Sequence, residues 1–281
     1  MSPSSDSADA LLREKEAKLL RIVDSLRSVA VAFSGGVDST LVLAVGRERL
    51  GDRAVGVIGV SDSLPPGELD EARSLARSIG APLVEVATRE LSDPGYVANP
   101  ENRCYFCKSE LYRHVLPWAS AHGFAHVADG MNQDDLGDWR PGGRAADEAG
   151  VRHPLLEAGL AKSDVRALAR SRGLANWDKP ALACLSSRVP YGTPIDAATL
   201  HRVGRAELAL RRLGFASVRV RLHGDVARIE VPPADVARLF ERRDRAIEGV
   251  KAAGFRFVAL DLEGYRSGSL NPVRATGDSA S

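Results

Sequence analysis

The sequence has few cysteines, 3 in 281 residues, which excludes the disulfide framework on which small secreted domains depend. It also lacks long apolar runs. No stretch approaches the ~18 apolar residues that span a bilayer, and the opening segment MSPSSDSADALLREKEAK has no secretory apolar core. We therefore expect a cytoplasmic protein with no membrane contact. In a reducing compartment, the CxxC pair Cys104 and Cys107 favours a metal, cluster or redox site over a structural bridge.

A large charge of either sign is also missing, because 38 Lys and Arg residues nearly balance 37 Asp and Glu residues. A net charge of +1 argues against a polycation built to bind nucleic acid, so no nucleic-acid partner is expected. The balance is uneven along the chain. Between His201 and Arg256, 12 arginines and one lysine stand against seven acidic residues. This excess favours an anionic ligand near the C-terminal part, although solvated helix faces explain most of these arginines equally well.

Apolar runs typical of buried strands alternate with helical patterns through the first part of the chain. The strand-like runs are SVAVAF, AVGVIGV, APLVEVA and FAHVAD, and GELDEARSLARSIG is typical of a helix that ends at Gly80. This alternation predicts an α/β fold with a doubly wound, mainly parallel sheet that binds ligands at the carboxyl ends of its strands. We expect this domain to cover residues 1–185, with its boundary in the irregular stretch ANWDKPALACLSSRVPYGTP.

Residues 186–281 predict a small α+β domain for substrate binding or oligomerisation, with a disordered polar tail. The expected order is helix (197–213), strand (SVRVRL), turn, strand (VARIEV), helix (234–253) and strand (FRFVALDL). In SVRVRL, Arg219 and Arg221 alternate with apolar residues, which predicts one apolar and one basic strand face.

The stretch AFSGGVDST, residues 32–40, follows a predicted strand and opens a predicted helix. Its glycines let backbone N–H groups approach a phosphate, and the helix N-terminus adds a positive dipole end. A carboxylate at Asp38 makes sense beside phosphates mainly when Mg²⁺ lies between them. A plain strand–turn–helix connection would explain one glycine and one serine but not the whole set. The candidate ATP-binding residues here are Ser34, Gly35, Gly36, Asp38, Ser39 and Thr40.

Two further segments follow predicted strands, where a nucleotide site would need them. Val60 and Ser61 lie where base and ribose usually bind in such folds, and a plain strand end explains them equally well. DGMNQDD, residues 129–135, supplies Gly130, Asn132 and Asp134 as candidates to hold metal or pyrophosphate. A polar turn that caps a helix is the alternative for this segment.

The three cysteines allow several kinds of site. A structural zinc site would need a fourth ligand, which His114 or His122 could supply. A thioredoxin-like dithiol would leave Cys184 unused and lacks the expected preceding strand, and three small apolar side chains are a further alternative. The setting of Cys184 favours a reactive sulfur, because cations at Arg188 and Lys179 would stabilise the thiolate that acts as nucleophile or metal ligand.

Several motifs together resemble one known family. SGGVDS is similar to the pyrophosphate loop of ATP pyrophosphatases, and no GxxxxGK[ST] phosphate loop occurs. With NRCYFCK, GMNQDDLGDWRPGGRAA, KPALACLSSRVPYG and FVALDLEGYRSGS, it resembles the LarE family over about Val29 to Ser269. Members of that family are pyridinium-3,5-biscarboxylic acid mononucleotide sulfurtransferases, which help to make the nickel-pincer nucleotide cofactor of lactate racemase.

The resemblance implies an AMP-forming enzyme with a Rossmann-like pyrophosphate-loop fold. ATP with Mg²⁺ would adenylylate each substrate carboxylate, and sulfur would then replace AMP to give a thiocarboxylate. Three cysteines matching Cys104, Cys107 and Cys184 imply a [4Fe–4S] cluster whose fourth iron can bind the sulfide that is transferred. The alternative is sacrificial, with Cys184 giving up its own sulfur to become dehydroalanine. The resemblance also implies a homo-oligomer, an external sulfide or sulfur donor, and other nickel-pincer biosynthesis enzymes as metabolic neighbours.

A mononucleotide with a phosphate and two carboxylates needs cationic partners, and arginine suits their bidentate binding. For the two strand arginines, an exposed strand face is the alternative. The substrate-binding candidates are Arg188, Arg219, Arg221 and Arg266. The catalytic candidates are Cys184, Arg188 and Asp38.

Three rival functions stay open. A tRNA thiouridine synthase of the same superfamily predicts a basic chain or an RNA-binding module, and the net charge of +1 argues against it. A non-catalytic ATP-binding or cluster-sensing module would need no reactive partner such as Cys184. An ammonia-using ligase would have no use for three cysteines.

Overall fold

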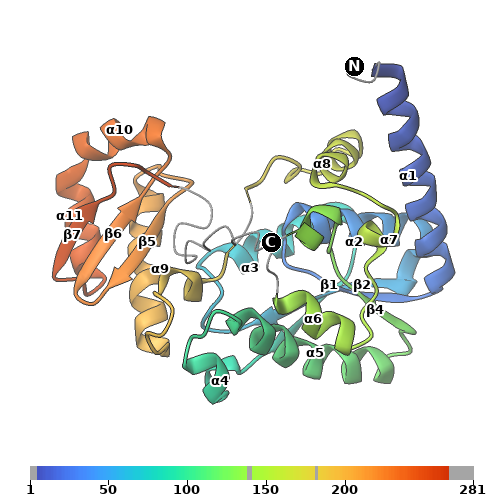
Figure 1. Ribbon diagram of the computed structural model, residues 1–281, viewed down its shortest axis with the longest axis horizontal. Helices are drawn as coiled ribbons and strands as arrows, with labels where there is room; N and C mark the ends of the chain where they lie inside the picture. The colour runs from blue at the N-terminus through green and yellow to red at the C-terminus, as the bar shows by residue number, and fades with distance from the viewer. Residues whose placement is uncertain (1–4, 138–140, 181–182, 266–281) are drawn as a thin grey trace, which may run out of the picture. The chain divides into compact units, whose positions relative to one another are not determined.

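The structure is a computed structural model that describes residues 5–137, 141–180 and 183–265. The chain forms two compact units, Met1–Leu182 and Ala183–Ser281 (Figure 1). The division falls three residues before the boundary that the sequence placed after residue 185.

The first unit contains the predicted parallel sheet. Its four strands run in the order β3-β2-β1-β4, and every pair is parallel. The strands are β1 (Val29–Ala32), β2 (Ala54–Val60), β3 (Leu83–Ala87) and β4 (His126–Ala128). All four lie within the runs that the sequence marked as strands, so the α/β fold class is confirmed. β1 lies inside the sheet and is fully buried, as its unbroken apolar sequence predicts.

Helices cover both faces of this sheet (Figure 1). Val29 and Val31 of β1 belong to one apolar core, whereas Ala30 and Ala32 belong to the other, as the two-residue period of a strand requires. The first core is completed by α1 (Ser5–Leu26), α2 (Val37–Leu50), α3 (Glu68–Ile79), α7 (Pro154–Glu157) and α8 (Lys162–Ser171). The second core is completed by α5 (Arg103–Ala121) and α6 (Pro141–Glu148). The short helix α4 (Pro94–Val97) also belongs to this unit.

The carboxyl ends of β1, β2 and β4 meet at one edge of the sheet, because the strands are parallel. The residues that the sequence singled out in AFSGGVDST, after Val60 and in DGMNQDD follow these three ends. The sheet therefore brings segments that are far apart in sequence into one region.

The second unit is a small α+β structure. Its elements are α9 (Ala197–Arg212), β5 (Arg219–His223), β6 (Val226–Glu230), α10 (Val236–Glu241), α11 (Arg243–Ala252) and β7 (Phe257–Leu260). β5 and β6 form an antiparallel hairpin around Gly224 and Asp225, and β6 pairs with β7 in parallel. The single helix expected over residues 234–253 is wrong. Arg242 leaves helical geometry (φ −99°, ψ 15°) and separates α10 from α11.

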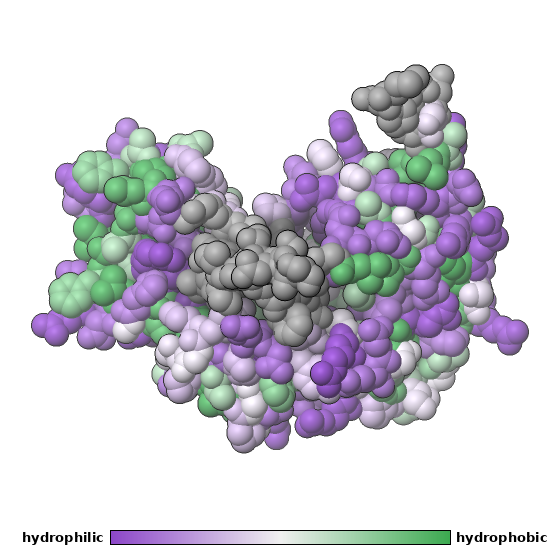
Figure 2. Space-filling model, in the orientation of Figure 1, coloured by the Kyte–Doolittle hydropathy of each residue, from purple (hydrophilic) through white to green (hydrophobic). Residues whose placement is uncertain are grey.

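Most of the visible surface is polar, with scattered apolar side chains (Figure 2). Phe240 and Phe257 of the second unit are 61% and 53% exposed. Arginine guanidinium groups lie over both rings, at 5.1 Å for Arg243 on Phe240 and 5.2 Å for Arg256 on Phe257. Among the described residues, no helix is long and apolar enough to cross a membrane.

Candidate active site

The loop between β1 and α2 is held by its own serines. Ser39 Oγ accepts a hydrogen bond from the Ser34 N–H group at 3.2 Å and donates to the Gly36 carbonyl oxygen at 3.1 Å. The Gly36 N–H group donates to Ser34 Oγ at 3.3 Å. Gly35 has a φ of 72°, a conformation that glycine adopts without strain. The loop thus turns tightly, and its backbone N–H groups donate hydrogen bonds to its own serine oxygens.

Thr40, the last residue of the candidate loop set, is fully buried. Its hydroxyl accepts a hydrogen bond from the side-chain amide of Asn176 at 3.0 Å. The Thr40 side chain therefore faces the interior of the first unit, where it anchors the start of α2.

The Asp38 carboxylate is paired with a lysine that sequence reasoning missed. Lys162 Nζ lies 2.5 Å from one carboxylate oxygen, and Asn132 Nδ2 donates to the other at 3.1 Å. Lys162 is the first residue of α8, where a cation is disfavoured by the positive end of the helix dipole. That unfavourable position is the sequence signal that could have singled it out. Asp134 offsets the cost, because its carboxylate accepts the Lys162 backbone N–H at 2.9 Å.

Gly130 lies against the start of α2. A methyl group on this residue would come within 2.6 Å of the Ser39 backbone nitrogen and 2.8 Å of Asp38 Cβ. Only glycine fits this approach without displacing the loop. A hydrogen bond within the adjoining turn stabilises it, because the Asp134 N–H group donates to the side-chain oxygen Oδ1 of Asn132 at 3.0 Å.

After β2, Val60 ends the strand and Ser61 joins a buried polar group. Ser61 Oγ donates to a Glu90 carboxylate oxygen, and Ser63 Oγ donates to the same oxygen at 2.7 Å. Glu90, which the sequence did not single out, is buried. The Ser61 hydroxyl therefore fixes the loop after β2.

A second charged group lies behind the end of β4. Asp129 contacts His153 Nδ1 at 2.7 Å and accepts from the Tyr112 hydroxyl at 3.2 Å, and His153 Nε2 lies 3.1 Å from Asp147. Burial alone lowers the pKa of His153, but the two carboxylates outweigh burial and raise that pKa above its ordinary value. Burial opposes ionisation of Asp129, yet His153 and the Lys108 ammonium hold its pKa below the usual range. This histidine is thus favoured in its charged form, donating from both nitrogens.

RCYFCK forms the first turns of α5. Cys104 is exposed and Cys107 is half-buried, and neither forms a disulfide. Three residues apart, they lie on one face of the helix. The next residue, Lys108, lies 5.6 Å from the centre of the Tyr112 ring. Tyr112 raises the pKa of Lys108, and burial raises the pKa of Tyr112 to about 12.

The histidines considered for a zinc site are engaged elsewhere. His114 Nε2 lies 2.9 Å from Glu110, and His122 stacks on Trp118 with ring centres 4.4 Å apart. His122 follows Cys107 by 15 residues along α5, roughly 22 Å at 1.5 Å per residue, so the two cannot share one ion. In residues 5–137, 141–180 and 183–265, no group of three or more His, Cys, Asp or Glu side chains is placed to hold a metal ion. Cys184 belongs to the other unit.

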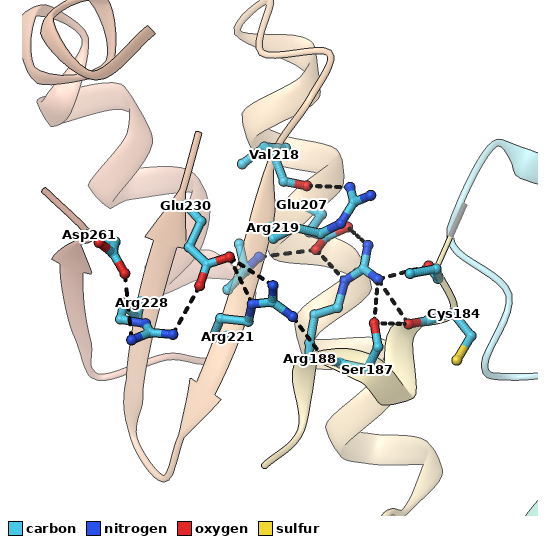
Figure 3. A network of polar contacts seen from close by, with 12 residues as sticks. Cys184, Ser187, Arg188, Glu207, Val218, Arg219, Arg221, Arg228, Glu230 and Asp261 are labelled. Atoms are coloured by element: carbon cyan, nitrogen blue, oxygen red, sulfur yellow. Dashed lines mark hydrogen bonds and ion pairs between the residues drawn. The ribbon is translucent and has the colours of Figure 1, made fainter. Parts of the chain in front are cut away.

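In the second unit, Cys184 precedes a short 3₁₀ turn (Leu185–Arg188). The Arg188 guanidinium donates to the Cys184 carbonyl oxygen at 2.9 Å and to Ser187 Oγ at 2.8 Å. It also forms a bidentate ion pair with Glu207, at 2.8 and 3.1 Å. The Cys184 carbonyl faces this network, whereas its sulfur points away from it (Figure 3). Arg188 therefore holds the Cys184 backbone, and its charge is neutralised by a buried carboxylate.

The other cation expected near Cys184 is also paired, within the first unit. Lys179 Nζ lies 3.0 Å from Glu68 and 2.8 Å from Glu71. Arg188 and Lys179 are thus both paired with carboxylates, so neither provides an unpaired positive charge to stabilise a Cys184 thiolate.

The strand arginines are buried, so the alternative of an exposed basic face on β5 is wrong. Arg219 and Arg221 are only 8% and 5% exposed. Arg221 pairs with Glu230 at 2.8 Å and donates to the Ser187 carbonyl oxygen, which fixes the turn that follows Cys184 (Figure 3). Arg219 donates to the Val218 carbonyl oxygen and lies 5.3 Å over the Tyr265 ring.

Burial, with the nearby Arg188 charge, lowers the pKa of Arg219. Among the described residues, no carboxylate lies within ion-pair distance of it. A bound anion would offset the cost of burying this positive charge. Arg219 is therefore better suited to bind an anionic ligand than Arg188 or Arg221, which are already paired with carboxylates. Arg266 lies outside the described residues.

Comparison with known proteins gives relatives over nearly the whole chain, although no protein-family model matches it. The chain is 43% identical over 263 residues to the pyridinium-3,5-bisthiocarboxylic acid mononucleotide synthase of Lactiplantibacillus plantarum, covering 93% of this chain and 95% of that protein. It is 48% identical to an uncharacterised protein of Synechocystis over 94% and 99% of the two chains, and 25% identical to one of Methanocaldococcus jannaschii over 89% and 98%. The chain therefore belongs to the LarE family, the pyridinium-3,5-bisthiocarboxylic acid mononucleotide synthases.

Proposed function

We propose that this chain is an ATP-dependent, AMP-forming sulfurtransferase. It converts both carboxylates of pyridinium-3,5-biscarboxylic acid mononucleotide to thiocarboxylates, in biosynthesis of the nickel-pincer cofactor of lactate racemase. The observation that carries the proposal is the constellation of Asp38, Lys162 and Asn132 at the glycine loop, in a chain 43% identical to a synthase of the bisthiocarboxylic acid product.

The loop residues support the nucleotide step. The N–H groups of Ser34 and Gly36 donate hydrogen bonds to serine hydroxyl oxygens. Phosphate oxygens of a bound nucleotide would take the place of these acceptors. Lys162 supplies the phosphate-binding cation that the missing GK[ST] motif would otherwise provide. The half-buried Asp38 carboxylate fits a Mg²⁺ ligand, and the ion when bound would neutralise the phosphates. The substrate carboxylate then attacks the α phosphorus, and pyrophosphate leaves.

Sulfur transfer completes the reaction. A sulfide attacks the acyl adenylate, the new C–S bond forms, and the bond to AMP breaks with the electron pair on the phosphate oxygen. Arg188 and Arg221 hold the backbone around Cys184, and Arg219 is the cation we assign to an anionic group of the substrate.

The three unbridged thiols fit a [4Fe–4S] cluster by their chemistry. Cys104 and Cys107 lie on one face at the N-terminus of α5, where the helix dipole favours thiolates, and Cys184 is half-exposed. Such a cluster, held by Cys104, Cys107 and Cys184, would supply an iron open to the sulfide that is transferred.

A second route uses the same Cys184 sulfur directly. Its thiolate displaces AMP to give a thioester, a base removes the Cys184 Cα proton, and the Cβ–Sγ bond breaks. Thiocarboxylate remains on the product and dehydroalanine on the protein. The route is kept because Cys184 is half-exposed and its sulfur points away from its arginine partners.

One anaerobic experiment tests the proposal. The purified chain is assayed for iron and acid-labile sulfide, then incubated with ATP, Mg²⁺, sulfide and the dicarboxylate mononucleotide, with masses followed for product and protein. Several equivalents of thiocarboxylate per chain, with Cys184 intact, support the cluster route. One equivalent, with a protein lighter by H₂S, supports sacrifice. Formation of neither AMP nor thiocarboxylate contradicts both, and thiolation of tRNA in a parallel incubation with tRNA in place of the mononucleotide would support the rival synthase.

Gly130→Ala is expected to weaken nucleotide binding, because its new methyl group collides with the backbone of the loop. Overpacking typically costs about 1–3 kcal/mol, which corresponds to about 5- to 150-fold in affinity. Calorimetric titration with α,β-methylene ATP and Mg²⁺ measures the loss. Gly143→Ala is the matched control, since a methyl group there meets only the flexible Met131 side chain, at 3.2 Å. Equal affinities for the two variants would show that Gly130 does not shape the site.

A further inference from the structure

The Asn176 side chain reaches the loop between β1 and α2 from the segment that follows α8. Its Nδ2 atom donates to the Gly35 carbonyl oxygen and to Thr40 Oγ1, both at 3.0 Å. A carbonyl oxygen only accepts, so the group that faces Gly35 is the NH₂ group of the amide. Asn176 is only 4% exposed, so water competes little for these bonds. One buried amide thus joins the loop to the first turn of α2.

The bond to Gly35 sets the direction of one peptide group of the loop. The Gly35 carbonyl group and the Gly36 N–H group belong to the same trans peptide, which is planar, so they point in opposite directions. Asn176 holds the oxygen, and the N–H group therefore points away from Asn176, toward Ser34 Oγ at 3.3 Å. This N–H group is one of the two to which we assigned a phosphate oxygen. A glycine on each side lets this peptide rotate easily, so its direction depends on what holds its oxygen.

The next carbonyl group of the loop is also held from within the first unit. The Gly36 oxygen accepts from the Thr40 N–H group at 3.0 Å, and Thr40 in turn is bound to Asn176 through its hydroxyl. The N–H group on the far side of this second peptide belongs to Val37, the first residue of α2, and the first N–H groups of a helix have no partner within it. Two successive N–H groups are therefore directed before an anion arrives.

Asn176 itself is held in a fixed place. Its carbonyl oxygen accepts from the Lys179 N–H group at 3.1 Å, and the Lys179 ammonium pairs with Glu68 and Glu71 of α3. The neighbouring Trp177 packs against the first apolar core. The amide is thus presented to the loop by a rigid support, which is what precise positioning of a binding group requires.

We propose that Asn176 is a positioning residue that directs the Gly36 N–H group at the phosphates of ATP. The inference rests on the proposed binding of ATP at this loop. Asn176→Asp keeps almost the same volume but replaces the NH₂ group by an acceptor, which would face the Gly35 oxygen in a buried place. The peptide then loses its fixed direction, and phosphate binding has to restore that direction at the expense of affinity.

Calorimetric titration of the full chain tests this role with two ligands, α,β-methylene ATP with Mg²⁺ and AMP. We expect Asn176→Asp to weaken binding of α,β-methylene ATP about tenfold or more, which corresponds to about 1.4 kcal/mol. AMP has no β or γ phosphate and should bind as it does to the parent protein. A merely structural role would instead lower the melting temperature and leave the ratio of the two affinities unchanged. Asn176→Ala also removes the donor and serves if the aspartate variant does not fold.

Ser28→Ala is the matched control. The buried Ser28 hydroxyl accepts from the Ala125 N–H group at 2.9 Å, at the opposite end of β1 from the loop. This variant also loses a buried side-chain hydrogen bond, yet it should keep the parent affinity for α,β-methylene ATP. Parent affinity in a folded Asn176 variant overturns the positioning role, and so does an equal loss for AMP. Absence of nucleotide binding by the parent contradicts the proposed function, and the role of Asn176 falls with it.

Discussion

Cys184→Ala is expected to abolish thiocarboxylate formation, by about a thousandfold or more, because both sulfur routes use this thiol. Cleavage of ATP in the first step should survive. The residues assigned to that step, including Asp38 and Lys162, belong to the first unit, whereas Cys184 belongs to the second. Product masses measure sulfur transfer, and exchange of labelled pyrophosphate into ATP in the presence of substrate measures adenylylation.

Cys104→Ala separates the two routes. If Cys104 is a cluster ligand, this variant loses the iron signal and multiple turnover but binds ATP like the parent. If Cys184 is sacrificed, Cys104→Ala still makes one equivalent of product. Full iron content in the Cys104 variant would show that the CxxC segment is not a ligand segment. Sulfur transfer at the parent rate by Cys184→Ala would overturn the role of Cys184 altogether.

The parts of the molecule that the sequence predicted are those encoded by local patterns. The buried strands follow from unbroken apolar runs, the end of α3 follows from Gly80, and the tight loop between β1 and α2 follows from glycines placed between a strand and a helix. The β5–β6 hairpin follows from Gly224 between two alternating runs. Each of these signals lies within about ten residues, which is the range over which periodicity and turn chemistry act.

The unpredicted residues act through partners that are far apart in sequence. Lys162 meets Asp38 across 124 positions, and Asn176 meets Gly35 across 141. No local period reports such pairs, since they depend on how the sheet brings its strand ends together. The same holds for the strand arginines. Alternation in SVRVRL predicted a basic face, but the carboxylate of Glu230 and the 3₁₀ turn cover Arg221, so that face is buried.

Glu207→Gln is expected to give a large loss of stability in the second unit. The Glu207 carboxylate is buried and binds Arg188 in two places, and it also accepts the Val220 N–H group at 3.0 Å. The substitution leaves the buried Arg188 cation without its neutralising charge, which typically costs about 3–5 kcal/mol. A loss of this size is a large part of the 5–15 kcal/mol by which domains are usually stable.

Native-state hydrogen exchange at the Val220 amide measures this loss in the second unit alone, which matters because a two-unit chain need not unfold in one step. Glu148→Gln removes the carboxylate of an exposed pair with Arg144 and is the matched control, with little expected effect on stability because water screens the pair. The double variant Arg188→Met/Glu207→Leu should recover part of the stability, because it removes both charges of the buried pair but leaves the Val220 N–H group without its Glu207 acceptor. It should still be impaired in sulfur transfer, since the Cys184 carbonyl then loses its hydrogen bond from Arg188 and keeps only those from Ser187. Full activity in that double variant would show that the ion pair serves stability alone.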